Sequence, residues 1–251
     1  RAPHHSASTA AMAGGGVRPR PGEITLAHGG VLFLDELPEF RRSTLEVLRQ
    51  PLEDRRITLA RSAAAYTYPA GFLLVAAMTP CPCGYYGDPG HSCRCTDTQI
   101  KAYRGRLSGP LMDRIDMQVE VFPPLYGELA EMEGSGQIIS SKTLSIAVRE
   151  AVAVQAQRFR DEAQHTNACM TPDQVRRHCR LDRTGSEILR LAFATRRLSA
   201  RGHQTVLRLA RTIADLAGAP DIEATHVAEA LGLRCLDRMD GSGDTGGVYG
   251  N

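Results

Sequence analysis

The chain has 251 residues, 42% hydrophobic and 23% charged, with a formal net charge of +2. This is the composition of an ordinary globular protein, long enough for one large domain and a smaller one. No segment approaches the roughly 20 apolar residues that span a bilayer and no secretory leader is visible, so we expect a cytoplasmic protein without membrane partners. The near-neutral charge excludes a uniformly basic nucleic-acid binder, so any DNA contact must come from local basic patches.

The beginning of the chain indicates that a part is missing. It starts at Arg1 rather than Met, and we interpret it as part of a longer protein. Only two lysines occur, Lys101 and Lys142, and neither follows a glycine-rich loop. The phosphate-binding motif GxxxxGK(S/T) is therefore absent from the sequence.

The first strong structural signal is the segment GGVLFLDELPEF, residues 29–40, which follows an irregular or hairpin segment over residues 1–22. Its apolar run predicts a strand over Val31–Leu34 that is buried on both faces, as in a parallel sheet. Ligands bind beyond the carboxyl ends of such strands, so Asp35 and Glu36 lie where a ligand would be met. The alternative is an ordinary strand that ends in a polar turn.

Three further elements are predicted before residue 79. Residues 41–56 have leucines at helical spacing, and Ser43 with Glu46 fits a capping box, which indicates an amphipathic helix. Residues 57–70 alternate as a β-hairpin does. The apolar run Phe72–Met78 predicts a second buried strand.

Residues 79–103 are expected to be irregular and rich in cysteine. Two close pairs, CPC and CRC, supply Cys81, Cys83, Cys93 and Cys95. Four thiolates in two pairs can enclose one Zn²⁺ tetrahedrally, although CxC pairs are less common than CxxC pairs in zinc sites. Unmetallated thiols and an iron–sulfur cluster are the alternatives, His91 is a possible substitute ligand, and disulfides are not expected in the cytosol.

The second half of the chain is expected to be helical. Residues 107–121 predict a helix end followed by a strand, and residues 144–159 predict a helix. Thr171 as N-cap with Pro172 at the first position predicts another helix. An apolar stripe predicts one more, through Val206, Leu209, Ala210, Ile213 and Ala217.

These elements predict a parallel α/β domain followed by a helical domain. The expected divisions are an α/β core over 1–127 with a cysteine-rich insert at 79–103, a linker over 128–142, a helical domain over 143–238 and a disordered tail over 239–251.

The order of the pieces resembles the magnesium-chelatase-like AAA+ ATPases of the ComM/YifB type, from Arg1 to about Asp237. The resemblance lies in GGVLFLDELPEF, EDRRITLARSAAAYTYPAGFLLVAAMTPCPCGYYGD, LSGPLMDRIDMQVEV and LSARGHQTVLRLARTIADLAG. It implies an AAA+ parallel-sheet core and a helical lid, with the P-loop and a Lon-protease-like domain upstream. It also implies a homo-hexameric motor that uses ATP and Mg²⁺ and acts on DNA, in branch migration during natural transformation.

The resemblance assigns roles to three residues on the ATPase core. Asp35 and Glu36 match the Walker B motif, in which one carboxylate can hold Mg²⁺ through its waters while the other orients the attacking water. Arg114 matches an arginine finger that stabilises the transferring phosphoryl group in a neighbouring subunit. The alternative for Arg114 is a helix-end arginine paired with Asp113 or Asp116.

Two sensor positions are implied in the same way. Thr79 occupies sensor 1, where the family usually has Asn, and its shorter hydroxyl lacks the paired donors of an amide, so it puts catalytic competence in question. Arg201 matches sensor 2. Arg208 lies two turns later on the same helix face and is its main rival.

The DNA contacts rest on the resemblance most of all. Arg61 lies near the tip of the hairpin that points into the pore of related helicases, where a basic side chain can hold a backbone phosphate. Arg18 and Arg20 in the upstream segment can act likewise, and solvated surface arginines are the alternative. Two other functions stay open: a chelatase-like or protein-remodelling AAA+ subunit, and a non-catalytic fragment without a P-loop.

Overall fold

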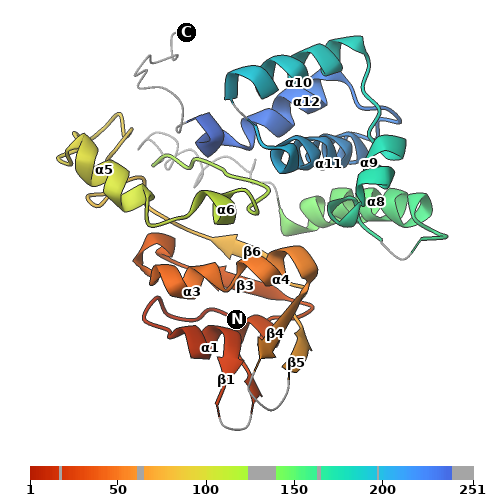
Figure 1. Cartoon of the computed structure of the whole chain (residues 1–251). Coiled ribbons are helices and arrows are strands. Elements are labelled where there is room, and N and C mark those ends of the chain that lie inside the picture. Colours follow the sequence, from red (N-terminus) through yellow and green to blue (C-terminus); the bar gives the residue numbers. More distant parts are fainter. Residues whose placement is uncertain (17–18, 61–64, 124–139, 163–164, 197, 239–251) are drawn as a thin grey trace. The chain divides into compact units, whose positions relative to one another are not determined.

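The structure is a computed structural model that describes residues 1–16, 19–60, 65–123, 140–162, 165–196 and 198–238. It divides into two compact units, Arg1–Ile115 and Asp116–Asn251. The first unit mixes helices and strands, and in the second the described residues form helices (Figure 1). The predicted α/β fold class with a helical C-terminal part is therefore confirmed. Most of the expected linker and the whole expected tail lie outside the described residues.

A parallel pair of strands forms the centre of the first unit. β3 (Val31–Leu34) pairs in register with β6 (Leu73–Ala76) (Figure 1). The backbone of Arg1 lies along β3 as well, because the Phe33 amide donates to its carbonyl at 2.9 Å. The Phe33 amide and the Leu34 carbonyl, which accepts from Ala77, point to opposite edges of β3, so β3 has a neighbour on each side.

β3 is buried on one face only, and β6 has no fully buried residue. Leu32 and Leu34 are fully buried in the core of the unit, whereas Val31, Phe33 and Leu73 are 44%, 37% and 62% exposed. The prediction of strands buried on both faces is therefore wrong for this chain. Alternate side chains of a strand point to opposite faces, and among the described residues nothing covers the second face.

The predicted helix over residues 41–56 is two short helices, α3 (Arg42–Glu46) and α4 (Arg49–Asp54). The predicted capping box is wrong, because Ser43 lies inside α3 and makes no cap. Pro51 explains the interruption. It has no amide proton to donate to the carbonyl of Val47, and its ring crowds that carbonyl.

Two antiparallel strand pairs confirm the predicted hairpins. β4 (Arg56–Ala60) pairs with β5 (Ala65–Pro69), and β1 (Gly14–Gly15) pairs with β2 (Arg20–Pro21). The other elements of this part are α1 (Thr9–Ala13), α2 (Glu23–Leu26) and the 3₁₀ helix η1 (Leu37–Glu39).

Residues 79–103 are less irregular than predicted, because α5 (Asp97–Arg104) occupies their end. Thr96 and Gln99 form a capping box there, with the Thr96 hydroxyl accepting from the Gln99 amide and the Gln99 side chain accepting from the Thr96 amide. The short helix α6 (Gly109–Met112) follows.

In the second unit, α9 (Pro172–His178) starts where the sequence predicts, after a capping box at Thr171. α8 (Ser141–Arg158) contains the predicted helix over residues 144–159 except for Phe159, and it begins three residues earlier. No described helix is both long and apolar enough to cross a membrane. The remaining elements are η2 (Asn167–Cys169), α10 (Arg183–Arg196), α11 (Ala200–Leu216), α12 (Ala224–Gly232) and η3 (Cys235–Arg238).

The predicted strand after α6 is wrong. Gln118 makes one isolated parallel bridge with Arg234, and residues 119–123 carry no strand. The Gln118 side chain also accepts a hydrogen bond from the Leu236 amide at 2.9 Å. These contacts attach the start of the second unit to its last helical turn, so this segment connects two parts of the unit and does not form a sheet strand.

α11 is the central helix of the second unit, and its stripe was predicted (Figure 1). Val206 and Ala210 are fully buried, and Leu209 and Ile213 pack at the edge of the same core. Ala217 is exposed just beyond the helix end, so the stripe is one residue shorter than predicted.

A buried ion network joins α8 to α11. The Arg158 guanidinium donates to both oxygens of Asp215 at 2.5 and 2.6 Å, and Arg211 donates to Asp215 at 3.1 Å. Asn167 in η2 adds a hydrogen bond of 2.8 Å. The Asp215 side chain is completely buried, so its charge depends on these donors.

Candidate functional site

Asp35 and Glu36 stand at the carboxyl end of β3 and both are exposed. The backbone of Glu36 is left-handed, with φ 51° and ψ 49°, and its amide donates to Asp35 Oδ1 at 2.9 Å. A non-glycine residue in this conformation is uncommon and clusters at functional sites. The turn leads into η1, so two neighbouring carboxylates end an otherwise apolar strand.

The end of β6 lies against this turn. Ala77 donates to the Leu34 carbonyl and accepts from the Leu37 amide, both at 2.9 Å. The segment toward Thr79 therefore runs beside the two carboxylates, as expected from two parallel strands. The Thr79 hydroxyl, however, donates to the Cys81 carbonyl at 3.1 Å and lies 2.9 Å from the Tyr103 hydroxyl. Its hydrogen bonds go to the cysteine-rich segment and to α5.

His5 joins the site although no sequence pattern pointed to it. The structure places its Nδ1 2.9 Å from Glu36 Oε2. His5 lies 31 residues before Glu36, on the turn between Arg1 and α1. No local pattern could have found this pair, because it depends on Arg1 running beside β3.

Arg114 is held inside the first unit. One guanidinium nitrogen donates to Glu53, another donates to the Pro110 carbonyl at 2.6 Å, and the side chain is only 15% exposed. Its Nε is buried without a partner among the described residues. The ion pair is made with Glu53 rather than with Asp113 or Asp116, the partners that the alternative interpretation expected.

The two candidates for sensor 2 differ in their surroundings. Arg201 lies in the first turn of α11 and is partly exposed. Arg208 donates to the Met170 carbonyl at 2.6 Å, and its Nε is buried. Arg208 is therefore used within the helical unit.

The four cysteines of the two CxC pairs come together, as predicted. Their Sγ atoms all lie within 4.8 Å of one another, and Cys81–Cys83, Cys81–Cys93 and Cys83–Cys93 are 3.4, 3.7 and 3.6 Å apart. A zinc tetrahedron with bonds of about 2.3 Å has edges of about 3.8 Å. The cluster, completed by Cys95, therefore has the donor set and the size to hold a metal ion.

The surroundings of the cysteine cluster give its thiols different pKa values. Backbone hydrogen bonds from Tyr85 and Arg94 lower the pKa of Cys83 to about 6, whereas desolvation raises the pKa of Cys95 to about 12. His91 is not in the cluster, because its Nδ1 lies 3.0 Å from Asp88 Oδ2. The expectation of His91 as a substitute ligand thus receives no support.

The cysteine cluster is tied to α5 as well as to Thr79. Arg104 donates from Nε to the Pro80 carbonyl at 3.0 Å, and its guanidinium lies 5.0 Å from the centre of the Tyr86 ring. Both contacts hold the cysteine-rich segment against the helix that follows it. The shape of the cluster and the position of Thr79 are therefore linked.

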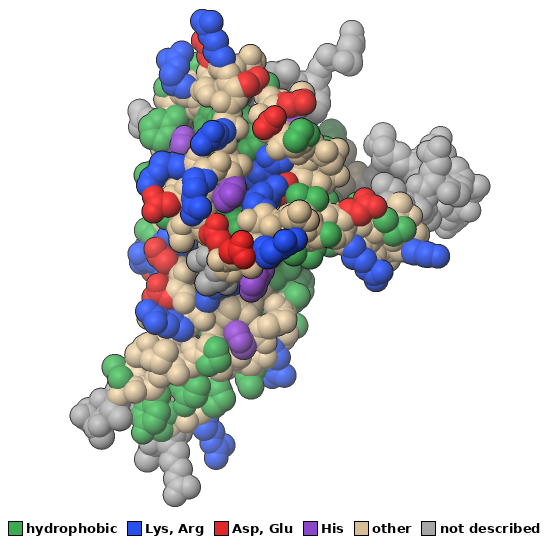
Figure 2. Space-filling view, turned by 90° about the vertical axis from the view of Figure 1, so that its right-hand side faces the viewer, with side chains coloured by type: hydrophobic (Ala, Val, Ile, Leu, Met, Phe, Trp, Pro, Cys, Tyr) green, Lys and Arg blue, Asp and Glu red, His purple; other side chains and the backbone are tan. Residues whose placement is uncertain are grey.

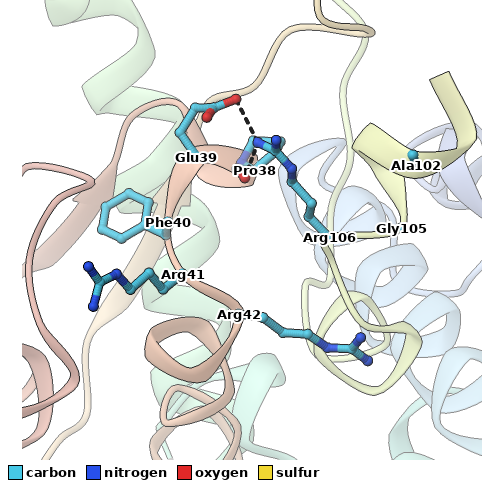
Figure 3. A pocket seen from close by; sticks show the side chains of 8 residues that line it. All are labelled: Pro38, Glu39, Phe40, Arg41, Arg42, Ala102, Gly105 and Arg106. Carbon is cyan, nitrogen blue, oxygen red and sulfur yellow. Dashed lines mark hydrogen bonds and ion pairs between the residues drawn. The ribbon is translucent and has the colours of Figure 1, made fainter. Parts of the chain in front are cut away.

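A basic cleft of about 480 Å³ lies between η1 and α5 (Figure 3). Arg106 extends toward Glu39 and the Pro38 carbonyl and donates hydrogen bonds to them at 2.9 and 3.2 Å. The Arg41 side chain extends away from Arg106. With Arg42, three arginines and one carboxylate line the cleft. Its charge suits an anion, but it is open and its arginines are exposed, so it is not a closed binding site.

The residues predicted to touch DNA are only partly described. Arg20 is exposed in β2, and Arg18 and Arg61 lie outside the described residues. On the face drawn in Figure 2, basic and acidic side chains of the described residues are interspersed. On this face, a DNA contact would therefore depend on a few arginines rather than on a broad basic surface.

Comparisons with known proteins give one consistent result. The family model "Magnesium chelatase, subunit ChlI" matches residues 1–129, and "Magnesium chelatase, subunit ChlI C-terminal" matches residues 139–234. The chain is 44% identical to YifB of Escherichia coli (strain K12) over 239 residues, which are 95% of the chain and 46% of YifB. It is also 44% identical to the competence protein ComM of Haemophilus influenzae over 239 residues, 95% of the chain and 45% of ComM.

A third relative is YifB of Salmonella typhimurium, 43% identical over 239 residues, which are 95% of the chain and 46% of that protein. The chain thus spans about half the length of the curated relatives that it matches.

Proposed function

This chain belongs to the magnesium chelatase subunit ChlI family, in the branch that includes YifB and ComM, and from this we propose that it forms part of an ATP-hydrolysing AAA+ motor that acts on DNA. Its mixed α/β unit and helical unit fit the AAA+-like fold of that family, with the α/β core incomplete. The observation that carries the proposal is the pair Asp35 and Glu36 at the end of β3, beside the end of β6.

Asp35 and Glu36 take different tasks in this proposal. Asp35 Oδ1 accepts from the Glu36 amide, which leaves Oδ2 to face a hydrated Mg²⁺, and carboxylate oxygens are ligands that Mg²⁺ prefers. Bound Mg²⁺ supplies positive charge beside the phosphates of ATP. Glu36 accepts a hydrogen bond from the attacking water and orients it in line with the γ-phosphate. The phosphate-binding loop comes from a part of the protein outside this sequence.

The basic residues complete the proposed site. Arg114 acts as a finger toward the nucleotide of a neighbouring subunit in a homo-hexamer, and it must leave Glu53 to do so. Arg201 senses the nucleotide from the start of α11. Thr79 occupies the sensor 1 position, and its bonds to Tyr103 and Cys81 support a structural link from that position to the cysteine cluster.

We propose Zn²⁺ as the metal of the cysteine cluster. Four cysteines with tetrahedral spacing and without an open position are typical of structural zinc sites. Zinc there neutralises neighbouring thiolates and stabilises a segment of few regular elements. An iron–sulfur cluster and free thiols remain as the outcomes that would replace it.

The proposed function assigns a role to each part of the chain. Residues 1–127 supply the ATPase core, and residues 143–238 supply the lid, with 128–142 between them. DNA is held by Arg61, Arg18 and Arg20, and the name of the relative ComM as a competence protein supports a DNA-related role.

A second function, remodelling of a protein by a chelatase-like subunit, is favoured by the net charge of +2 and by the interspersed surface charges. It would use the same carboxylates for hydrolysis, so it differs only in what stimulates the motor. The third possibility, a non-catalytic fragment, follows from the missing GxxxxGK(S/T) motif and concerns this chain alone.

The experiment that tests the ATPase uses Glu36→Gln in the natural protein that contains this chain. We expect this variant to bind ATP normally and to lose about 100-fold in turnover, because only the orientation of water is removed. Asp54→Asn, an exposed change at the end of α4, is the control and should leave turnover unchanged. Equal turnover of Glu36→Gln and the unaltered protein would contradict the proposal.

A further inference from the structure

We infer that His5 is a positioning residue for Glu36 in ATP hydrolysis, an inference that rests on the function proposed above. His5 Nδ1 lies 2.9 Å from Glu36 Oε2, and the two side chains are 34% and 62% exposed. An ionised carboxylate can only accept a hydrogen bond, so Nδ1 carries the proton and donates a hydrogen bond to Glu36 Oε2.

Two neighbouring rings contact the imidazole of His5. The His4 ring centre lies 4.1 Å away, and the Phe40 ring meets His5 edge-on at 6.4 Å. Phe40 is itself buried, at 3% exposure, and His4 Nδ1 lies 2.9 Å from the Ser6 hydroxyl. The ring of His5 is therefore oriented by its neighbours before it meets Glu36.

The backbone around His5 is anchored at both ends. On one side, Arg1 is hydrogen-bonded to β3 at 2.9 Å through the Phe33 amide. On the other, the Ala7 amide closes a turn onto the His4 carbonyl at 2.9 Å, and Ser8 caps α1. His5 thus lies on a short turn whose two ends are fixed, next to the carboxyl end of β3.

This arrangement gives Glu36 the support that its own position lacks. Glu36 is exposed on a left-handed turn, and its flexible side chain would otherwise sample several rotamers. The bond from His5 engages Oε2 and leaves Oε1 to accept a hydrogen bond from the attacking water. His5 therefore acts on the reaction through Glu36 and need not touch the nucleotide.

The test uses steady-state kinetics in the natural protein that contains this chain. We expect His5→Ala to lower kcat about tenfold, since orientation of a catalytic group is lost. KM for ATP and the Kd of a fluorescent ATP analogue should stay within about twofold. His5→Asn should recover most of kcat, because its amide nitrogen takes the place of Nδ1.

The chain offers a matched control. His91 pairs with the Asp88 carboxylate at 3.0 Å in the same unit rather than with Glu36, so His91→Ala should leave kcat unchanged. In a Glu36→Gln background, His5→Ala should cause no further loss of kcat, because both substitutions remove the same function. Independent losses that multiply would overturn the inference.

Four further outcomes of these measurements are decisive. Unchanged or raised kcat in His5→Ala would overturn the inference, and so would a parallel loss of ATP binding, which indicates a merely structural role. If Glu36→Gln itself hydrolyses ATP normally, the proposed function and the inference both fail. If Glu36→Gln is inactive while His5→Ala is normal, only the role of His5 fails.

Discussion

The hydroxyl groups of Tyr103 and Thr79 lie 2.9 Å apart, which joins α5 to the segment that follows β6. Because the Thr79 hydroxyl donates to the Cys81 carbonyl, the Tyr103 hydroxyl is the donor in this pair. One side chain thus receives a bond from α5 and gives one to the cysteine cluster. These two bonds connect α5, Thr79 and the cysteine-rich segment.

Tyr103→Phe should therefore lower the free energy of unfolding by about 1 kcal/mol, the usual contribution of one hydrogen bond. Urea unfolding measures this change. The control is Tyr66→Phe, since Tyr66 is 42% exposed in β5, and we expect a change below about 0.5 kcal/mol. Equal effects of the two substitutions would show that the bond does not stabilise the unit.

Arg114→Ala should abolish most ATP turnover in the natural protein, because the charge on the transferring phosphoryl group loses its partner. Mixing Arg114→Ala with Glu36→Gln subunits should restore part of the activity, since some sites then combine an intact arginine with an intact glutamate. Mixtures without any recovery would argue against a finger supplied by a neighbour. Arg114 would then be a structural partner of Glu53.

The cysteine cluster should carry about one zinc ion per chain, measured by elemental analysis. Cys83→Ser should lose the metal, whereas Cys169→Ser, outside the cluster, should keep it. Chelation should lower the thermal midpoint, because metal binding contributes to folding. Metal-free protein with four freely titrating thiols would contradict the site, and iron in place of zinc would correct its identity.

Asp215 predicts the pH dependence of the helical unit. Burial raises the pKa of its carboxyl, but hydrogen bonds from Arg158 and Asn167 outweigh burial, and the net pKa is lowered. The ionised form therefore adds stability above the unfolded value of about 3.9, and this stability is lost as pH falls through the lower folded pKa.

Asp215→Ala should cost about 3–5 kcal/mol at neutral pH, because it leaves Arg158 and Arg211 buried without their anion. Acid titration of unfolding should be flatter in this variant. The exposed Asp173→Ala is the control and should change stability by less than about 1 kcal/mol. A small loss for Asp215→Ala would mean that the ion network is not needed.

Arg61→Ala should weaken DNA binding similarly for all sequences and reduce the slope of log affinity against log salt by about 1 for each phosphate that is no longer bound. ATPase activity without DNA should barely change. Arg20→Ala, in the other hairpin, tests the second candidate in the same assay. Unchanged affinity and salt slope in both variants would favour the protein-remodelling alternative.

Local patterns explain which elements could be predicted. An apolar run after Gly29–Gly30 indicated β3, and Thr171 with Pro172 indicated the start of α9. The CxC pairs indicated the metal-binding donor set, because each pair holds two thiols close together. Pro51 indicated the break between α3 and α4, but the prediction followed the helical spacing of the leucines instead.

Tertiary contacts explain what the sequence did not reveal. His5 reaches Glu36 only because Arg1 lies beside β3, and Arg114 reaches Glu53 across 61 residues. Burial on one face of β3 was missed because an apolar run looks the same whether one face or both are covered by this chain. Such contacts depend on topology, which periodicity does not specify.

ATP hydrolysis by the natural protein, measured as DNA is added, tests the proposed DNA motor itself. We expect the rate to rise severalfold and to saturate, and Glu36→Gln to stay inactive at every DNA concentration. A protein that hydrolyses ATP at the same rate with and without DNA, or that responds to an unfolded protein and not to DNA, would contradict the claim that this family member is a DNA motor.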